Sequence, residues 1–235
     1  MDSDKLIFSI IGGITILILV FILGSSFLKQ PVEINDVAFI SGGSSSDGSF
    51  LLDDVSSHRI GPEYPKLILV EFSDYQCPSC KLYEPIVKSL LEKYPNDLSL
   101  VYRHFPLPVH NMAIPAARAS EAAALQGKFW EYSSILFERQ PSFSNDELIS
   151  YASELGLDME QFKSDFNSQE VATIVNSDYQ TATDLNLPGT PTFFLINGDK
   201  VEQLNLQNDG DLESKIAEIL GPGISEPAVE TSIPE

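Results

Sequence analysis

Two cysteines, Cys77 and Cys80, lie between an apolar run and a pattern typical of a helix. The run from Lys66 to Ser73 is short and nearly continuously apolar, as in a strand buried within a sheet. After Cys80, apolar residues recur at three- and four-residue spacing as far as about Tyr94, which is the period of a helix with one buried face. The sequence therefore predicts a buried strand, a turn that carries Cys77, and a helix that begins at the cysteine pair.

Strand and helix patterns continue along the chain in a fixed order. Ser144 and Glu147 have the spacing of a capping box at the start of a helix. Asn197-Gly198 marks a hairpin between two apolar runs. The order predicts an α/β fold whose sheet is interrupted by a block of helices. The predicted elements are strands at 66–73 and 98–105, helices between about 110 and 186, strands at 192–196 and 201–206, and a helix at 211–220.

The N-terminal segment is predicted to anchor the chain in a membrane. Residues 6–28 carry no charge, and as a helix they rise about 34 Å, enough for a bilayer core of about 30 Å. Small residues at 24–26 leave a cleaved signal peptide as the alternative, but the length favours an uncleaved anchor. Lys5 and Lys29 flank the segment, so positive charge does not decide its orientation.

Composition divides the chain further. We predict an anchor over residues 1–28, a flexible linker rich in glycine and serine over 29–57, and a folded domain over 58–221. The helical insertion occupies about residues 110–186 of that domain, and the acidic tail at 222–235 is predicted to be disordered. The chain has 14 basic and 34 acidic residues, a net charge of −20, which disfavours binding to nucleic acid.

The cysteine pair indicates redox chemistry. A disulfide between Cys77 and Cys80 closes so small a loop that it stabilises the fold little. At a helix start, the N–H groups and dipole favour a thiolate at Cys77, and Cys80 lies close enough to resolve a mixed disulfide. The alternative is half of a zinc site, completed on folding by His104 and His110, but these histidines lack ligand spacing. We therefore predict a thiol centre with neither a metal nor a bound cofactor.

Five short segments, in a fixed order, carry a family resemblance: Glu71–Cys80 (EFSDYQCPSC), Tyr102–Leu107, Pro115–Ala119, Gly127–Trp130 and Gly189–Phe193. In this order they resemble segments of the DsbA-like thiol–disulfide oxidoreductases of the thioredoxin superfamily. The resemblance extends over about residues 66–220 and implies a thioredoxin fold with an inserted α-helical domain, preceded here by the transmembrane helix.

The resemblance also implies roles for single residues. Cys77 corresponds to the nucleophile and Cys80 to its disulfide partner. Pro191 corresponds to a cis-proline that faces the pair, and the backbone of Thr190 would bind the substrate. Glu71 corresponds to a buried acid that relays a proton to or from the second cysteine.

The predicted function is the introduction of disulfides into exported proteins that carry thiols. A redox partner in the membrane is expected to reoxidise the pair, with the catalytic domain outside the cytoplasm; this placement follows from the function. Ser79 departs from the histidine of the best-known relative, so the disulfide is expected to be less oxidising. A reductase or isomerase fed by a membrane electron donor is the first alternative. An anchored module without catalysis, using the cysteines for zinc, is the second.

Overall fold

The computed structural model of the protein describes residues 51–52, 58–141, 143–208 and 210–223. The predicted anchor at 6–28, most of the predicted linker and most of the predicted tail lie outside these ranges. Within them, every helix is too short or too polar to cross a membrane.

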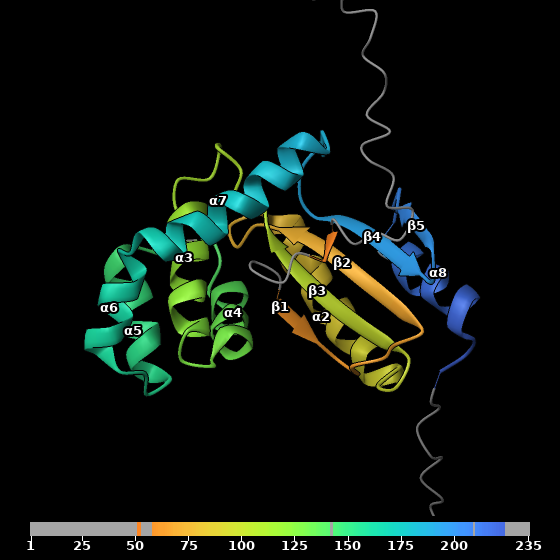
Figure 1. Cartoon of the computed structure of the whole chain (residues 1–235), viewed down its shortest axis with the longest axis horizontal. Helices are drawn as coiled ribbons and strands as arrows, with labels where there is room; N and C mark the ends of the chain where they lie inside the picture. The colour runs from red at the N-terminus through yellow and green to blue at the C-terminus, as the bar shows by residue number, and fades with distance from the viewer. Residues whose placement is uncertain (1–50, 53–57, 142, 209, 224–235) are drawn as a thin grey trace, which may run out of the picture. The chain divides into compact units, whose positions relative to one another are not determined.

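A mixed sheet forms the centre of the fold, in the strand order β1-β3-β2-β4-β5 (Figure 1). β2 lies in the middle, parallel to β3 and antiparallel to β4. β1 and β5 complete the edges in antiparallel pairings. The strands are β1 His58–Ile60, β2 Leu67–Ser73, β3 Leu98–His104, β4 Thr192–Asn197 and β5 Lys200–Gln203.

The two faces of the sheet are covered by different helices because successive strand residues point to opposite sides. Leu69 of β2 packs in one apolar cluster with residues of α2 (Pro78–Lys93) and α8 (Asp211–Leu220). Val70, the next residue along β2, packs in another cluster that includes Ala182 of α7 (Gln169–Asp184). β2 is therefore buried on both faces, as its continuous apolar run predicts.

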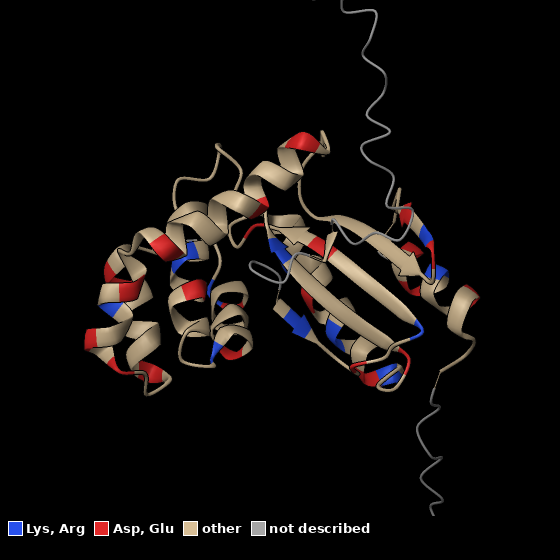
Figure 2. Ribbon diagram, in the orientation of Figure 1, with Lys and Arg blue, Asp and Glu red and all other residues tan. Residues whose placement is uncertain are grey.

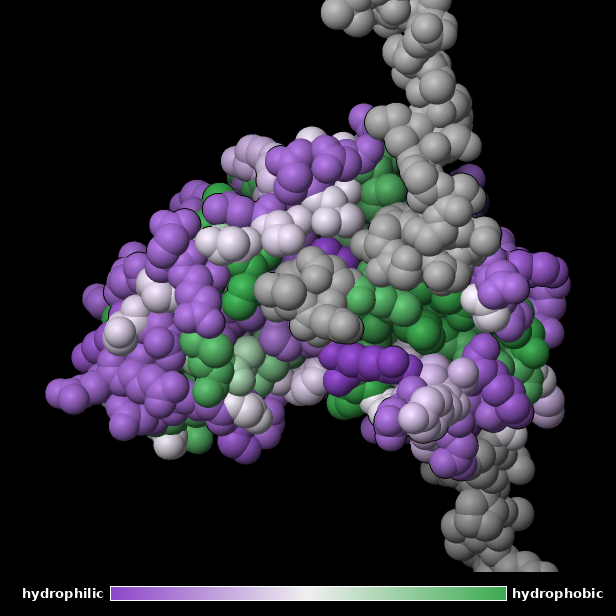
Figure 3. All heavy atoms as spheres, in the orientation of Figure 1, coloured by the Kyte–Doolittle hydropathy of each residue, from purple (hydrophilic) through white to green (hydrophobic). Residues whose placement is uncertain are grey.

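A block of helices separates β3 from β4 in the sequence and lies to one side of the sheet (Figure 1). It has its own aromatic and alanine-rich core, which also includes Cys77 and Cys80. Acidic residues are frequent along its helices (Figure 2), and its surface is mostly hydrophilic in the view of Figure 3. The cysteine pair thus lies where the block meets the sheet. Besides α7, the helices are α3 Ala113–Ala124, α4 Phe129–Glu138, α5 Asn145–Glu154 and α6 Met159–Phe166.

Most predicted elements are confirmed, including the Ser144–Glu147 capping box at the start of α5. Two features differ from the prediction. β5 ends at Gln203, whereas the sequence predicts a strand to residue 206. Leu51 falls within the predicted linker, yet it is fully buried and its carbonyl accepts a hydrogen bond from Arg103. β1 begins directly after the predicted linker, at a position where the sequence predicts no strand. Long-range pairing with β3 and Arg103 orders them, so local composition gives no sign of it.

Candidate active site

Cys77 lies at the N-cap of α2, directly after the turn that follows β2. Its carbonyl accepts the hydrogen bond of the Lys81 N–H at 3.2 Å, and its own N–H donates to the Asp74 carbonyl at 3.0 Å. Pro78 occupies the first helical position, where it lacks no hydrogen bond that the helix needs. The sulfur is therefore held at the positive end of α2, as the sequence predicts.

Asp74 fixes the turn before Cys77. Its side chain is buried and accepts hydrogen bonds from the backbone N–H groups of Gln76 and Leu107, at 2.7 and 2.8 Å. The ring of His110 lies 2.7 Å from the same carboxylate. Three partners on two segments thus lock the loop whose end carries the cysteine.

The loop before β4 faces Cys77 across the site. The Cys77 sulfur lies 3.2 Å from the carbonyl oxygen of Thr190, to which its thiol donates. The Thr190–Pro191 peptide bond is cis, as the family resemblance implies. Gly189, just before it, has a φ of +156°, a backbone conformation that residues with a side chain rarely adopt. The structure therefore places the Thr190 backbone and its cis peptide bond to Pro191 against the Cys77 sulfur.

Both cysteines are free thiols and both are buried, Cys80 completely and Cys77 to 6% exposure. Hydrogen bonding from the Cys80 thiol is the main cause that lowers the pKa of Cys77 from 9.0 to about 5, against the opposing effect of burial. The Thr190 side chain and the N–H groups of Cys80 and Ser79 lower it further. Burial and the same hydrogen bond raise the pKa of Cys80 well above 9.0. The two sulfurs thus differ in acidity, with Cys77 the more acidic thiol and Cys80 the one that keeps its proton.

Glu71 lies in the middle of β2 and is 4% exposed. Burial, aided by the charges of Glu84 and Cys77, raises the pKa of Glu71 from 4.5 to about 7. Glu71 also lines a cavity of about 100 Å³, which exceeds the space that one water molecule needs. Lys88 and Glu84, which form an ion pair, line the same cavity. A buried acid that titrates near neutral pH therefore lies beside a space that can hold water.

A larger groove runs along the other side of the pair. Its volume is about 630 Å³, and residues next to Cys77 and from the end of β5 line it. The chain at 204–206 leaves the sheet after one further hydrogen bond, from the Leu204 N–H to the Phe193 carbonyl at 2.9 Å, and so forms one wall. The lining residues include Ser79, Tyr83, Thr190, Pro191, Phe193 and Leu206.

Two glutamines join the cysteine turn to the helical block, and sequence reasoning missed both. The Gln140 amide donates to the carbonyls of Tyr75 and Cys77, at 2.5 and 3.2 Å. The Gln76 amide donates to the Pro141 carbonyl at 3.1 Å and accepts from the Met112 N–H at 2.5 Å. Only Pro141, directly after Gln140, marks this loop in the sequence, and nothing there ties it to the cysteines.

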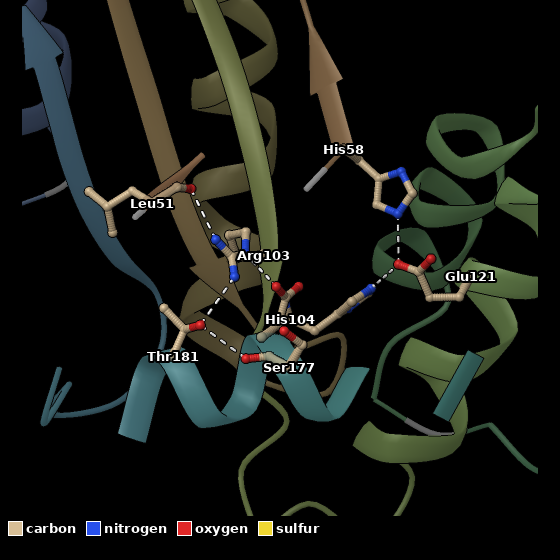
Figure 4. Close-up of polar contacts among 8 residues, drawn as sticks. Leu51, His58, Arg103, His104, Glu121, Ser177 and Thr181 are labelled. Atoms are coloured by element: carbon tan, nitrogen blue, oxygen red, sulfur yellow. Dashed lines mark hydrogen bonds and ion pairs between the residues drawn. The ribbon is translucent and has the colours of Figure 1, made fainter. Parts of the chain in front are cut away.

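The histidines lie in two separate places. His110 contacts Asp74, whereas His104 and His58 both approach Glu121 of α3 (Figure 4). Burial alone raises the pKa of Glu121, but hydrogen bonds from His104 and His58 outweigh it and lower the pKa to about 2. The zinc alternative for the cysteines needs His104 and His110 together beside the sulfurs. In the structure, His110 contacts Asp74 and His104 contacts Glu121, so these two histidines do not complete a zinc site with the cysteines.

Comparison with known proteins agrees with this fold. A family described as Thioredoxin matches residues 53–213. A thioredoxin-like oxidoreductase from Silicibacter pomeroyi is 27% identical, with a TM-score of 0.61 over 73% of this chain and 96% of that one. The thiol–disulfide exchange protein α-DsbA2 from Wolbachia pipientis is 23% identical, with a TM-score of 0.62 over 74% of this chain and 92% of that one.

A curated relative matches only in part. The Na⁺/H⁺ antiporter NhaA 1 of Mycolicibacterium vanbaalenii is 42% identical over 135 residues, which are 56% of this chain and 22% of that protein. The chain spans about a quarter of the length of the curated relatives it matches. Because most of that relative lies outside the match, its antiporter activity is not carried over to this chain.

Proposed function

This chain belongs to the thioredoxin family, with DsbA-like thiol–disulfide oxidoreductases as its structural neighbours, and on that premise we propose that it introduces disulfides into exported proteins. The lowered pKa of Cys77 carries the proposal. A thiolate that is stable at neutral pH stabilises the reduced protein, and a pair whose reduced form is stabilised is an oxidant when it is a disulfide.

The reaction consists of two exchanges. A substrate thiolate attacks the Cys77 sulfur of the disulfide, the Cys77–Cys80 bond breaks, and Cys80 leaves. The second substrate thiolate then attacks the sulfur of the first substrate cysteine in the mixed disulfide, forms the substrate disulfide and releases Cys77 as a thiolate. Two substrate thiols have become one disulfide, and the enzyme holds two more electrons.

Glu71 has a role in the first exchange. Cys80 leaves as a thiolate, but its raised pKa means that it must gain a proton. With a pKa of about 7, Glu71 is about half protonated at neutral pH and can supply that proton through water in its cavity. In reoxidation the proton returns to Glu71.

The groove beside Thr190 is the proposed substrate site. The Cys77 sulfur lies within hydrogen-bond distance of the Thr190 backbone, so a peptide that lines up with residues 190–192 presents its cysteine to that sulfur. A backbone-directed site of this kind accepts many sequences, as an enzyme that acts on diverse unfolded chains requires.

The location follows from the same proposal. Residues 6–28 would anchor the chain, with the catalytic domain outside the cytoplasm among newly exported proteins. A membrane redox partner would accept two electrons and two protons and so regenerate the disulfide. Anchoring keeps the enzyme, its substrates and this partner at high local concentration.

The decisive experiment mixes the oxidised full chain with a reduced, unfolded protein that has two cysteines, and counts the disulfides formed. Cys77→Ser is expected to abolish both turnover and mixed disulfides. Cys80→Ser cannot form the disulfide and is expected to abolish turnover, but its Cys77 thiolate should attack the same protein in its disulfide form and accumulate mixed disulfides, which separate on gels without reductant. Full turnover by Cys77→Ser would refute the assignment, and a strongly reducing equilibrium with glutathione would make the enzyme a reductase.

A further inference from the structure

Two histidines from different strands converge on one carboxylate away from the cysteine pair. The Nε2 atoms of His58 in β1 and His104 at the end of β3 lie 2.6 and 2.7 Å from the same Oε1 of Glu121 in α3. All three atoms lie within 4.8 Å of one another. In Figure 4 both rings point toward the Glu121 carboxylate, which lies between them. Three separate elements thus present three ligand-type atoms to one point.

The cluster is held in place by its surroundings. The side chains of His104 and Glu121 are 1% and 3% exposed. His58 stacks on Phe129, with ring centroids 3.4 Å apart and planes 14° apart. At 21% exposure, His58 also leaves a path from solvent to the cluster. The ligand atoms of His104 and Glu121 are therefore fixed by burial, and the cluster is accessible to solvent at His58.

The donor set selects the kind of ion. Two imidazole nitrogens and one carboxylate oxygen suit Zn²⁺ and similar transition metals, with the fourth position left to water. Ca²⁺ and Mg²⁺ prefer oxygen ligands alone. Tetrahedral bonds of about 2.0–2.1 Å place neighbouring ligand atoms about 3.3 Å apart. Both contacts from the histidines to Glu121 must therefore widen by roughly 0.7 Å, which requires small rotations of the two rings and of the Glu121 carboxylate.

Metal binding also requires the histidine protons to move. A ligating Nε2 needs its ring proton on Nδ1. In the part of the chain that the structure describes, Nδ1 of His104 is buried and has no hydrogen-bond partner. The metal–ligand bonds must therefore offset both an unpaired Nδ1–H group and the lost hydrogen bond from Nε2 to Glu121.

We propose that His58, His104 and Glu121 bind one divalent transition-metal ion of the Zn²⁺ class. The ion would cross-link β1 and β3 to α3, and so join the edge of the sheet to the helical block. It would stabilise the folded chain rather than take part in thiol exchange. The inference does not depend on the proposed function, because its ligands exclude both cysteines.

The test uses the full chain in detergent, with a tag free of histidine and with Cys77→Ser and Cys80→Ser to remove thiol ligands. After metal is stripped with a chelator, the protein is incubated with Zn²⁺, desalted and analysed for bound metal. We expect one zinc ion per chain. At free Zn²⁺ of 100 times Kd, the ratio of folded to unfolded protein is expected to rise by about 100-fold. Co²⁺ in the same site is expected to give visible d–d bands without a thiolate charge-transfer band.

Matched variants identify the ligands. His58→Phe keeps a ring to stack on Phe129 and is expected to lose the zinc, whereas His110→Gln, at the chain's remaining histidine, is expected to keep it. If His58→Phe does not fold, Glu121→Gln keeps the side chain's shape and is likewise expected to lose the metal. Zinc retained by the folded variants, no zinc in the parent protein, or stabilisation by Ca²⁺ alone would overturn the proposal and leave a hydrogen-bonded His–Glu–His cluster.

Discussion

Reduction of the Cys77–Cys80 disulfide is expected to bind only about one proton for every two electrons at neutral pH. With a pKa of about 5, Cys77 is ionised at pH 7, while Cys80, with its pKa well above 9.0, is protonated. Each proton taken up with two electrons changes the potential by about 30 mV per pH unit. The reduction potential should therefore fall by about 30 mV per pH unit between about pH 5 and 8. Below pH 5, where both cysteines take up a proton on reduction, it should fall by about 60 mV per pH unit.

The same shift sets how oxidising the disulfide is. Because the folded pKa is lowered, stabilisation of the reduced form is complete above the ordinary value of 9.0 and disappears as pH falls through about 5. At pH 7 the shift from 9.0 to about 5 contributes about 2.7 kcal/mol. For a two-electron couple this raises the potential by about 60 mV over an unperturbed dithiol.

Equilibration of the full chain with glutathione at several pH values measures both quantities. Glu71 near the pair also titrates, so Glu71→Gln should be measured in parallel to isolate the proton of the cysteines. A slope of about 60 mV per pH unit in both proteins through pH 8 would mean that Cys77 stays protonated, and the reasoning from its surroundings would be refuted.

Three other substitutions test the surrounding structure. Glu71→Gln is expected to slow formation of the mixed disulfide by up to about 100-fold in stopped-flow experiments. Burial raises the pKa of Glu71 from 4.5 to about 7, so the ionised carboxylate destabilises the fold above pH 7. Glu71→Gln should therefore raise the free energy of unfolding above pH 7 by up to about 3 kcal/mol. An unchanged free energy of unfolding would contradict the raised pKa. Arg103→Ala leaves Asp178 buried without its ion-pair partner and should reduce the free energy of unfolding by about 3–5 kcal/mol in urea melts. Ser144→Ala removes the capping box of α5 and should cost about 1 kcal/mol, with Ser144→Asp as the control that retains stability.

The elements with strong local patterns are the ones that the sequence predicts well. β2 is apolar on both faces because helices cover both, and the Ser144 box closes within one turn of helix. β1 is only three residues long and gains its order from pairing with β3, so no window of sequence contains the cause. The order of Leu51 is equally hidden from local sequence, since the hydrogen bond to its carbonyl comes from Arg103, 52 positions away.

The site divides in the same way. Cys77 and Cys80 are recognisable because their chemistry depends on adjacent residues and on the helix that follows. Thr190 and Pro191 required a family resemblance, since the loop lies 113 positions from Cys77. Gln140 and the pairing of His58 with Glu121 had no signal, because single hydrogen bonds between distant segments leave no periodic trace.

The three titrating groups of the site form one unit. The hydrogen bond that keeps the proton on Cys80 is the same one that stabilises the Cys77 thiolate, so an acidic first sulfur requires a basic second one. Such a pair oxidises substrates quickly only if a neighbour carries the proton of Cys80. Burial of Glu71 on β2, beneath the helix that carries both sulfurs, gives that neighbour a pKa of about 7. Under the proposed function, the apolar strand therefore contributes to the chemistry, because the burial that makes β2 a central strand also raises the pKa of the acid it carries.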